Sequence, residues 1–423
     1  MKTFRHFITI MWLLYWAILF LVWNQPLRYT FLGEQPVLEL GMSSLNDVIW
    51  IPIGLAILAY IAWFSFNRLM FPGRWLVFSA AGFVVLLLVL LHLPGYFRLL
   101  LIPTVVFFGL MFWRLYKQKR IEAHVLAFSF LLLSVVFYYN TQLFPNASGR
   151  RQPDRLYLKL FSINIGLSLP KERHMQLMSR ILEEEPDIVF LQEFRRVQKH
   201  YFQETLQPMY PYQTWSSHTT NYLGGAILSK IPFQQEETIK LSSRYNSRAN
   251  VNYATLSVAD RTVHLINCHL SHGGHEILLG MRGKQSLETS LDSARIGFLR
   301  HVEEAKQIKE RIAGIHGPLI VAGDFNDTPN SLVYVQFSKR LYNAYAERGW
   351  GLGTTYGEYS LRHIVPALRP LLFDVFRIDH VFCSPHFDIH RARVLPVVYS
   401  DHKPLVVYIS IKKGKSKDEQ ISG

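Results

Sequence analysis

Two hydrophobic patterns divide the 423-residue chain near residue 150. Before this point the sequence contains nearly continuous apolar runs of about 15 to 19 residues, close to the lower limit for crossing a bilayer. These runs cover residues 6–23, 48–64, 75–93, 99–113 and 124–139. After it, short β-rich runs alternate with stretches in which apolar residues recur at helical spacing. Residues 146–155, a polar segment that includes Asn, Ser, Gly and Pro, separate the two parts and predict a linker.

The first part predicts a multi-helix transmembrane region over residues 1–145 with about five spans. Trp23, Trp50, Trp63 and Trp113 lie at or near run ends, where their amphipathic rings favour the membrane interface. A set of buried core helices in a large soluble protein is the alternative, and five successive runs with short polar loops argue against it. No Asp, Glu, Lys or Arg lies in the middle of a run, which favours anchoring in the lipid bilayer over transport.

The distribution of Lys and Arg predicts which side of the membrane the second part occupies. With five spans and the N-terminus inside, eight Lys and Arg fall in cytoplasmic segments, and only Arg28 and Arg98 fall in outside loops. This bias predicts a multi-pass protein whose second part is extracytoplasmic. If a weak run does not span, such as the one that contains Pro103, the second part lies in the cytoplasm instead.

The formal net charge of +14 is shared equally between the two parts. The chain has 11 Lys and Arg against 4 Asp and Glu before residue 151, and 34 against 27 from there on. In the second part this excess is compatible with an anionic substrate or with a basic solvated surface. Cys268 and Cys383 are the only cysteines, and the apolar residues around each predict two buried unpaired thiols.

The second part predicts β-sheets covered by helices, which is an α/β fold. Strands are predicted at residues 156–165, 187–193, 224–230, 251–259, 262–270, 317–325, 377–384 and 404–411. Amphipathic helices are predicted at residues 171–186 and 293–314. The first of them places Met175, Leu177, Met178, Ile181 and Leu182 on one side. The tail, residues 412–423, has the composition of a disordered segment.

Several of the predicted strands end near a side chain that can bind a metal ion or a phosphate. These residues are Asn164, Glu193, His269, Asp324, Asn326, Asp379, Asp401 and His402. Taken singly, each has a structural explanation, such as a helix cap, an Asx turn or a buried histidine. Because neighbouring strands gather their ends at one edge of a sheet, we expect these side chains to meet in one cleft.

The residue types in this set share a chemistry. Glu193, Asp324 and Asp401 offer hard oxygen ligands, which suit Mg²⁺ or Mn²⁺. The two asparagines can coordinate or hydrogen-bond without adding charge. The two histidines can donate to phosphate oxygens or protonate a leaving group. The sequence has no His-rich zinc pattern and no Ser or Cys nucleophile motif, so the chemistry indicated is metal-assisted attack of water on phosphorus.

Seven short motifs in a fixed order resemble the endonuclease/exonuclease/phosphatase superfamily. They are "FSINIG", "PDIVFLQE", "GGAILSKIPF", "INCHL", "VAGDFND", "RIDHVF" and "SDHKPL". The resemblance covers about residues 156–411, nearly the whole second part. It implies a four-layered α/β sandwich, in which two packed mixed β-sheets are flanked by helices. With the apolar runs before it, the chain looks like a membrane-anchored bacterial-type member.

The resemblance also implies the metal ligands and the cofactor. Glu193 of "LQE" matches the principal metal carboxylate, and Asn164 of "SINIG" lies beside it. Asp401 of "SDH" matches a second carboxylate on the metal side. The expected cofactor is Mg²⁺ or Mn²⁺.

The remaining motif residues match groups that act on water and phosphate. Asp324 of "GDFN" matches the residue that orients or deprotonates the attacking water, and Asn326 matches a phosphate or water contact. His402 matches the histidine that binds the scissile phosphate, with Asp379 of "RID" fixing its tautomer. His269 of "NCHL" matches the histidine that hydrogen-bonds the phosphate and serves the leaving group.

The motifs predict the reaction better than the substrate, which depends on the loops between them. The loop at residues 271–292 contains Arg282, and the loop at 242–250 contains Arg248; both are candidate substrate contacts, although a surface insertion is the simpler interpretation of the first. Three hypotheses follow: a membrane-anchored phosphodiesterase or phosphatase acting on lipid head groups, an extracytoplasmic nuclease acting on DNA or RNA, or a non-catalytic membrane scaffold that binds phosphorylated ligands. None of them requires an obligate protein partner.

Overall fold

The computed structural model describes residues 154–166, 170–194, 196–216, 224–244, 249–271, 286–329, 331–351, 353–356, 376–396 and 400–412. The five apolar runs, most of the linker, nearly all of the tail, and the residues Arg248 and Arg282 lie outside these stretches. Within them, no helix combines the length and the apolar character needed to cross a membrane.

The chain divides into two compact units. The described residues of the first unit belong to Ala147–Arg348 and Arg377–Gly423, and those of the second belong to Gly349–Phe376. In the second unit, Tyr356 and Phe376 form an isolated antiparallel bridge. All eight motif residues named above belong to the first unit.

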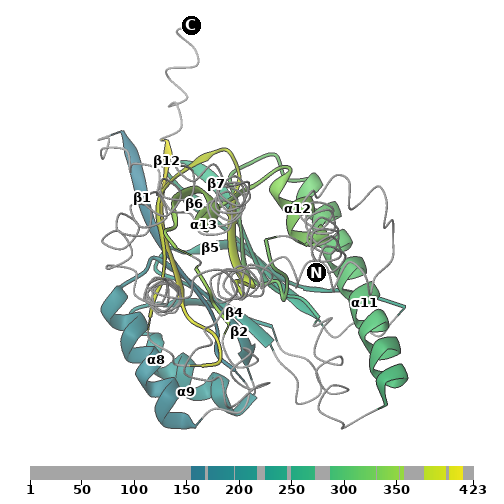
Figure 1. Ribbon diagram of the computed structural model, residues 1–423. Helices are drawn as coiled ribbons and strands as arrows, with labels where there is room; N and C mark the ends of the chain where they lie inside the picture. The colour runs from purple at the N-terminus through teal and green to yellow at the C-terminus, as the bar shows by residue number, and fades with distance from the viewer. Residues whose placement is uncertain are drawn as a thin grey trace, which may run out of the picture. The chain divides into compact units, whose positions relative to one another are not determined.

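Two six-stranded mixed sheets form the first unit (Figure 1). Their strand orders are β11-β12-β1-β2-β4-β3 and β5-β6-β7-β8-β10-β9. The first sheet contains β1 (Arg155–Asn164), β2 (Ile188–Phe194), β3 (Tyr212–Trp215), β4 (Gly224–Ser229), β11 (Phe387–Val394) and β12 (Leu405–Lys412). The second contains β5 (Phe233–Lys240), β6 (Asn250–Val258), β7 (Arg261–His269), β8 (Leu319–Asp324), β9 (Tyr342–Asn343) and β10 (Asp379–Cys383). β1 pairs parallel with β2, and β7 pairs parallel with β8.

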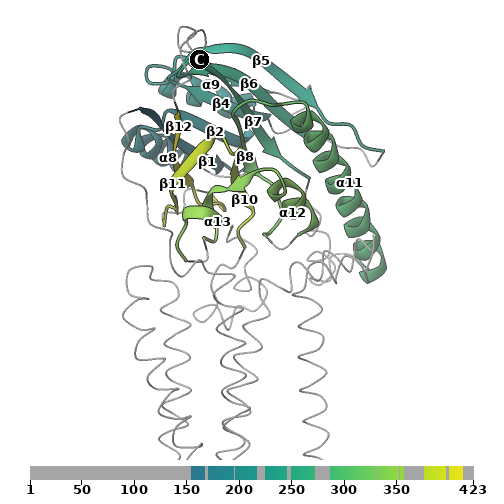
Figure 2. The ribbon, with the colours of Figure 1, turned by 90° about the horizontal axis from the view of Figure 1, so that it is seen from above.

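Helices cover the outer faces of both sheets (Figure 2). α8 (Lys171–Glu184) and α9 (Arg196–Leu206) pack on the first sheet, whereas α11 (Leu287–Ala313) and α12 (Leu332–Ser338) pack on the second. One buried apolar cluster lies between the sheets and also receives side chains of the short helix α13 (Ala344–Arg348). The predicted sandwich of two packed mixed sheets with flanking helices is therefore confirmed.

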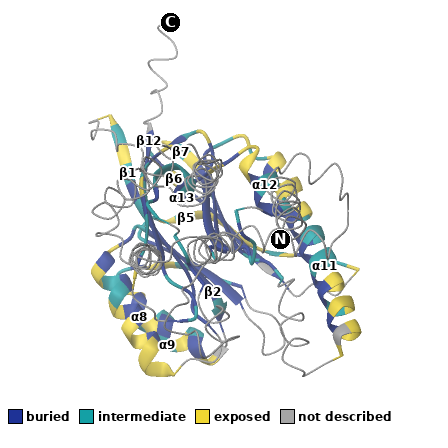
Figure 3. Cartoon of the chain, viewed as in Figure 1, coloured by how far each residue is buried: buried dark blue, intermediate teal, exposed yellow. Residues whose placement is uncertain are grey.

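Burial explains why these segments form these elements. The strands at the centre are buried almost throughout, whereas the helices bury one side and expose the other (Figure 3). In α8 the predicted Leu177, Met178 and Ile181 are buried, but Met175 is 42 % exposed and His174 is buried in its place. His174 tolerates burial because its ring nitrogens lie 3.3 Å from the Ile165 carbonyl oxygen and 2.7 Å from the Tyr201 hydroxyl.

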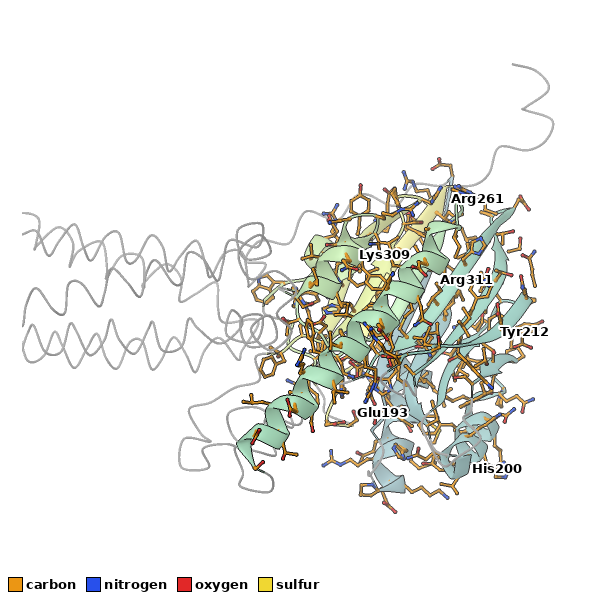
Figure 4. All side chains as sticks on the ribbon, turned by 90° about the vertical axis from the view of Figure 1, so that its right-hand side faces the viewer. Glu193, His200, Tyr212, Arg261, Lys309 and Arg311 are labelled. Carbon is orange, nitrogen blue, oxygen red and sulfur yellow. The ribbon has the colours of Figure 1, made fainter. Side chains whose placement is uncertain are left out.

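The pairing register brings the strand ends of both sheets to one edge. In the second sheet, His269 pairs with Asp324 between β7 and β8, and Asp379 pairs with Asp324 between β10 and β8. In the first sheet, Asn164 at the end of β1 pairs with Gln192, the residue before Glu193 in β2. Figure 4 shows Glu193 and Arg261, which begins β7, at opposite ends of the sheets. Within each sheet, the pairing register therefore places these strand ends at the same edge.

Candidate active site

β8 delivers Asp324 to the site through a close approach of two backbones. Gly323 has a φ of +136°, and a Cβ atom added there would lie 2.0 Å from the carbonyl oxygen of Cys268 on β7. Only glycine fits this position, because any side chain would overlap the neighbouring strand. The glycine in "AGDF" therefore allows β7 and β8 to place His269 and Asp324 side by side.

Asp324 lies at the centre of the site and is only 1 % exposed. Its Oδ2 atom accepts a hydrogen bond from Asn164 Nδ2 at 2.9 Å, and its Oδ1 atom accepts one from the Asn326 backbone N at 2.8 Å. The Nε2 atoms of His269 and His402 each lie 3.7 Å from Oδ2. The carboxylate is thus fixed by two donors, and two imidazole rings lie near its Oδ2 atom.

Burial and charge act against each other on the Asp324 carboxyl group. Burial raises its pKa because the charged form loses hydration, and Asp379 raises it further, whereas His402 and His269 lower it. The outcome is a pKa of about 6. A carboxylate with a pKa near neutrality is a better proton acceptor than an ordinary surface aspartate.

Glu193 stands on an irregular part of β2. The pairing between β2 and β4 shifts between Leu191 and Phe194, and Glu193 has a φ of +63°, in the left-handed region. A bulge of this kind turns a side chain away from the regular alternation of a strand. Glu193 Oε1 lies 3.4 Å from His269 Nε2, so the bulge directs the carboxylate toward the second sheet.

His402 and Asp379 form a buried ion pair at the other side of Asp324. His402 Nδ1 donates to Asp379 Oδ2 at 2.8 Å, which leaves Nε2 directed toward Asp324. Burial disfavours the imidazolium, but the carboxylates of Asp379 and Asp324 outweigh it and raise the pKa of His402 to about 10. At neutral pH, His402 is therefore a cation.

Asn326 occupies a tight turn after β8. Its φ is +50°, a conformation that Asn adopts more readily than most residues. Its Nδ2 atom donates to the Leu270 carbonyl oxygen at 2.9 Å, which ties the turn to the end of β7. Asp327, the next residue, belongs to the same turn.

Asn164 and Asp401, both predicted on the metal side, have different surroundings. Asn164 is 1 % exposed, and its amide makes two hydrogen bonds. Its Nδ2 atom donates to Asp324, and its Oδ1 atom accepts from the Gly166 backbone N at 3.0 Å. Asn164 thus holds Asp324. Asp401 is partly buried next to His402 and raises its pKa, and among the described residues its Oδ1 atom has no hydrogen-bond partner.

Two sets of described side chains have the donor spacing of a metal site. Possible ligand atoms of Glu193, His269 and Asp324 all lie within 4.8 Å of one another, and those of Asp324, Asp379 and His402 do so as well. The second set already contains the His402–Asp379 hydrogen bond, so the first set is the better candidate. Of the predicted carboxylate ligands, Glu193 belongs to it, whereas Asp401 belongs to neither set. The Asn164 amide donates to Asp324.

Sequence reasoning missed a buried amide pair that supports Glu193. Gln192 Nε2 donates to Asn267 Oδ1 at 2.7 Å, and Asn267 Nδ2 donates to the Leu191 carbonyl oxygen at 2.9 Å, which joins the two sheets beside the bulge. Asn267 lies two residues before His269, so both side chains point to the same face of β7. That alternation is the signal that could have identified it.

Comparisons with known proteins identify a family and several structures to which the chain is similar. A model of the endonuclease/exonuclease/phosphatase family matches residues 139–402. A family protein from Bacteroides thetaiotaomicron has 18 % sequence identity and a TM-score of 0.47, covering 61 % of this chain and 98 % of its own. A mannosyl-6-phosphatase from the same species has 20 % identity and a TM-score of 0.46, covering 60 % of this chain and 99 % of its own.

The catalytic domain of human Nocturnin with bound sulfate has 20 % identity and a TM-score of 0.43, covering 62 % of this chain and 100 % of its own. No curated protein was found to match the chain. The family match spans more than half of the chain and includes all eight predicted site residues. The chain belongs to the endonuclease/exonuclease/phosphatase family and is a phosphoric ester hydrolase.

Proposed function

We propose that this chain is a divalent-metal-dependent phosphodiesterase that uses water to attack phosphorus in line with the leaving group. The observation that carries the proposal is the convergence of Glu193, His269 and Asp324, whose possible ligand atoms lie within 4.8 Å of one another. These residues come from strands of both sheets, so their convergence is a property of the fold rather than of one loop.

The donor chemistry of this set fits a divalent cation. Glu193 and Asp324 offer carboxylate oxygens, the ligand type preferred by Mg²⁺ and Mn²⁺, and His269 offers an imidazole nitrogen that suits Mn²⁺ better. When bound, such an ion neutralises the negative charge that develops on the phosphoryl oxygens. A set with two carboxylates and one imidazole agrees with the predicted Mg²⁺ or Mn²⁺.

Residues of the chain accept the proton of the attacking water and bind the phosphate. Asp324 accepts the proton of the attacking water, because its Oδ2 atom lies at the centre of the cluster, next to Asn164, His269 and His402. His402 donates from Nε2 to a phosphoryl oxygen and stays cationic, since Asp379 holds Nδ1. Asn326 contacts the water or the phosphate, and His269, which the sequence predicted to hydrogen-bond the phosphate, is assigned instead as the imidazole ligand of the cation.

We further propose that the protein is anchored in the membrane and acts on phosphate esters close to the bilayer, lipid head groups first. The support is the five apolar runs before residue 150 and the short linker that follows them. A tether of this length concentrates the domain at the membrane surface. The Lys and Arg bias supports an extracytoplasmic position for the domain. Reporter fusions at residue 150 and at the C-terminus test this placement, and activity of a cytoplasmic reporter there would contradict it.

Purified full-length protein tests the hydrolase. Sphingomyelin, phosphoinositides, plasmid DNA, RNA and a chromogenic phosphodiester are each incubated with Mg²⁺ or Mn²⁺ or with chelator. Glu193→Ala, Asp324→Ala and His402→Ala should each lower turnover by roughly 10²- to 10⁴-fold while the chain stays folded. Glu236→Ala, which removes an exposed carboxylate from the edge strand β5, is the matched control and should retain wild-type turnover.

The panel also decides between substrates. Hydrolysis of lipid head groups supports the proposed membrane substrate, whereas preferred hydrolysis of DNA or RNA replaces it with the nuclease alternative. Metal-independent turnover, or near-normal turnover by Glu193→Ala, would overturn the mechanism.

A further inference from the structure

α11 carries two buried polar side chains that face the active-site loops. His301 is 3 % exposed and Glu304 is fully buried, and neither belongs to the motif set described above. They are three residues apart, so they lie on the same side of the helix. Buried titratable groups in a helix that covers a sheet require partners, and both find them next to catalytic residues.

Glu304 holds the chain where it leaves β7. Its two carboxylate oxygens accept hydrogen bonds from the backbone N and the Oγ atom of Ser271, both at 2.7 Å. Ser271 follows Leu270, whose carbonyl oxygen accepts from Asn326 Nδ2 and whose backbone N donates to the Asp324 carbonyl oxygen at 3.0 Å. Glu304 is therefore linked to the Asp324–Asn326 turn through two consecutive residues.

His301 joins the same segment to the other side of the turn. Its Nδ1 atom lies 2.8 Å from the Ser271 carbonyl oxygen, and its Nε2 atom lies 3.1 Å from Asp327 Oδ2. A carbonyl oxygen and a carboxylate oxygen both accept, so both ring nitrogens donate and the ring is an imidazolium. The cation and the Glu304 carboxylate together clamp Ser271 and Asp327 with charge-assisted hydrogen bonds.

The turn between these anchors needs such support. Asn326 has a φ of +50°, and a non-glycine residue in this conformation persists only where its surroundings hold it. The Asp327 carbonyl oxygen accepts from His380 Nε2 at 2.8 Å, so Asp327 is held through its backbone by β10 and through its side chain by α11.

We propose that His301 and Glu304 are positioning residues, which act through Ser271 and Asp327 to hold Asp324 and Asn326 in the geometry that hydrolysis requires. This inference rests on the proposed function for its kinetic consequence. Its structural consequence, an ordered turn at residues 324–327, is independent of any substrate. α11 is thereby assigned a supporting role at the active site.

The helix supplies a matched control on the adjacent residue. Glu303 accepts from Ser243 Oγ at 2.7 Å and pairs with Arg244 at 2.7 Å, so it holds the segment after β5 instead. Glu303→Gln and Glu304→Gln are the same chemical change on neighbouring residues. A general loss of helix stability affects both, whereas loss of positioning affects only Glu304→Gln.

The experiment compares wild type, His301→Gln, Glu304→Gln and Glu303→Gln in the purified full-length chain. Amide hydrogen exchange of peptides covering residues 323–329 and 268–271 is measured first. We expect exchange at least 10-fold faster in His301→Gln and Glu304→Gln, and wild-type exchange in Glu303→Gln. With the phosphodiester substrate that wild type hydrolyses best, kcat should fall roughly 10- to 100-fold in the same two variants, with KM within about two-fold.

A double-mutant cycle separates positioning from a structural role. On an Asn326→Ala background, His301→Gln should lower kcat by less than about three-fold, because its effect passes through the turn that Asn326 forms. Wild-type exchange in the folded variants, full additivity in the cycle, or an equal loss of kcat in Glu303→Gln would each overturn the inference.

If His301→Gln does not fold, the near-isosteric Glu304→Gln tests the inference through the same exchange and kcat measurements. A wild-type chain without phosphodiesterase activity refutes the proposed function alone, and the exchange measurement still decides on positioning.

Discussion

Asp324 shows how one residue can be both buried and reactive. Its carboxylate has lost nearly all contact with water, and donors from Asn164 and Asn326 replace only part of that hydration. Because the compensation is partial, the pKa stays at about 6 instead of falling below the ordinary value. The same burial strengthens the attraction between the Asp324 carboxylate and the His402 cation. The two charged groups therefore lie close together without a proton passing from His402 to Asp324.

The Asp379–His402 pair predicts a shift in the pH dependence of activity. Asp379→Asn keeps a hydrogen-bond acceptor near Nδ1 but removes the charge that contributes most to the raised His402 pKa of about 10. Since the role proposed for His402 requires the imidazolium, activity should be lost as pH rises through its pKa. The variant should therefore lose activity at a lower pH than wild type and be roughly 10²-fold slower at pH 8, with a smaller deficit at pH 6.

A pH profile of kcat/KM from pH 5 to 10 checks this prediction. Asp388→Asn is the control. It alters an exposed aspartate on β11 that pairs with Arg155 of β1, and it should retain the wild-type profile. An unchanged alkaline limit in Asp379→Asn would show that His402 does not act as a cation.

At the scale of elements, strand β8 depends on one glycine. Gly323→Ala places a Cβ atom 2.0 Å from the Cys268 carbonyl oxygen at a φ of +136°, and the atom it meets is backbone that cannot move aside. We expect this variant to lose more than about 4 kcal/mol of unfolding free energy, enough to abolish folded protein. Gly314→Ala at the end of α11 is the control, because its nearest neighbour would lie 3.8 Å away. The yield of folded protein and the thermal unfolding midpoint measure the difference, and a folded Gly323→Ala chain would refute the prediction.

Elements with a strong hydrophobic pattern could be predicted from the sequence, and elements without one could not. The buried strands β1, β2, β7 and β8 lie within one or two residues of their predicted limits. β5 was missed because "FQQEETIK" forms an edge strand whose side chains are mostly exposed. Such a strand does not need alternating apolar residues, so its sequence lacks the pattern that predicts a strand. α11 begins at Leu287, six residues before the predicted start. Its first turns expose Leu291 and Ile296, which blurs the amphipathic pattern.

The candidate site shows the same limit. The motif residues from Asn164 to His402 could be placed because each lies near the start or the end of an apolar strand, and these strand ends share one edge. His301 and Glu304 could not, because their role depends on which loops α11 covers, and that packing has no local signature. The hydrogen bond from Asn164 Nδ2 to Asp324 also could not be predicted, because it depends on how the two side chains are oriented.

At the scale of the whole molecule, the site exists only when the two sheets are packed together. β1 and β2 supply Asn164 and Glu193 from one sheet, while β7 and β8 supply His269 and Asp324 from the other. The inter-sheet contact therefore serves both stability and function, since the apolar cluster between the sheets holds the two halves of the site in register. An unfolded chain has no comparable arrangement of ligands, so a cation that binds this site binds the folded state selectively.

This selectivity predicts that the metal stabilises the fold. At a free Mn²⁺ or Mg²⁺ concentration about 100 times the dissociation constant, the folded state gains about 2.7 kcal/mol, equivalent to a rise of roughly 5 to 10 °C in thermal midpoint for a domain of this size. Chelator should reverse the rise. Glu193→Ala/Asp324→Ala should show less than a quarter of it, because the remaining His269 is a weak ligand alone. The Glu236→Ala chain should respond as wild type does, since its change is on the exposed edge strand. An equal rise in the double variant would mean that the cation acts elsewhere on the folded chain, and the assignment of Glu193 and Asp324 as its ligands would then be wrong.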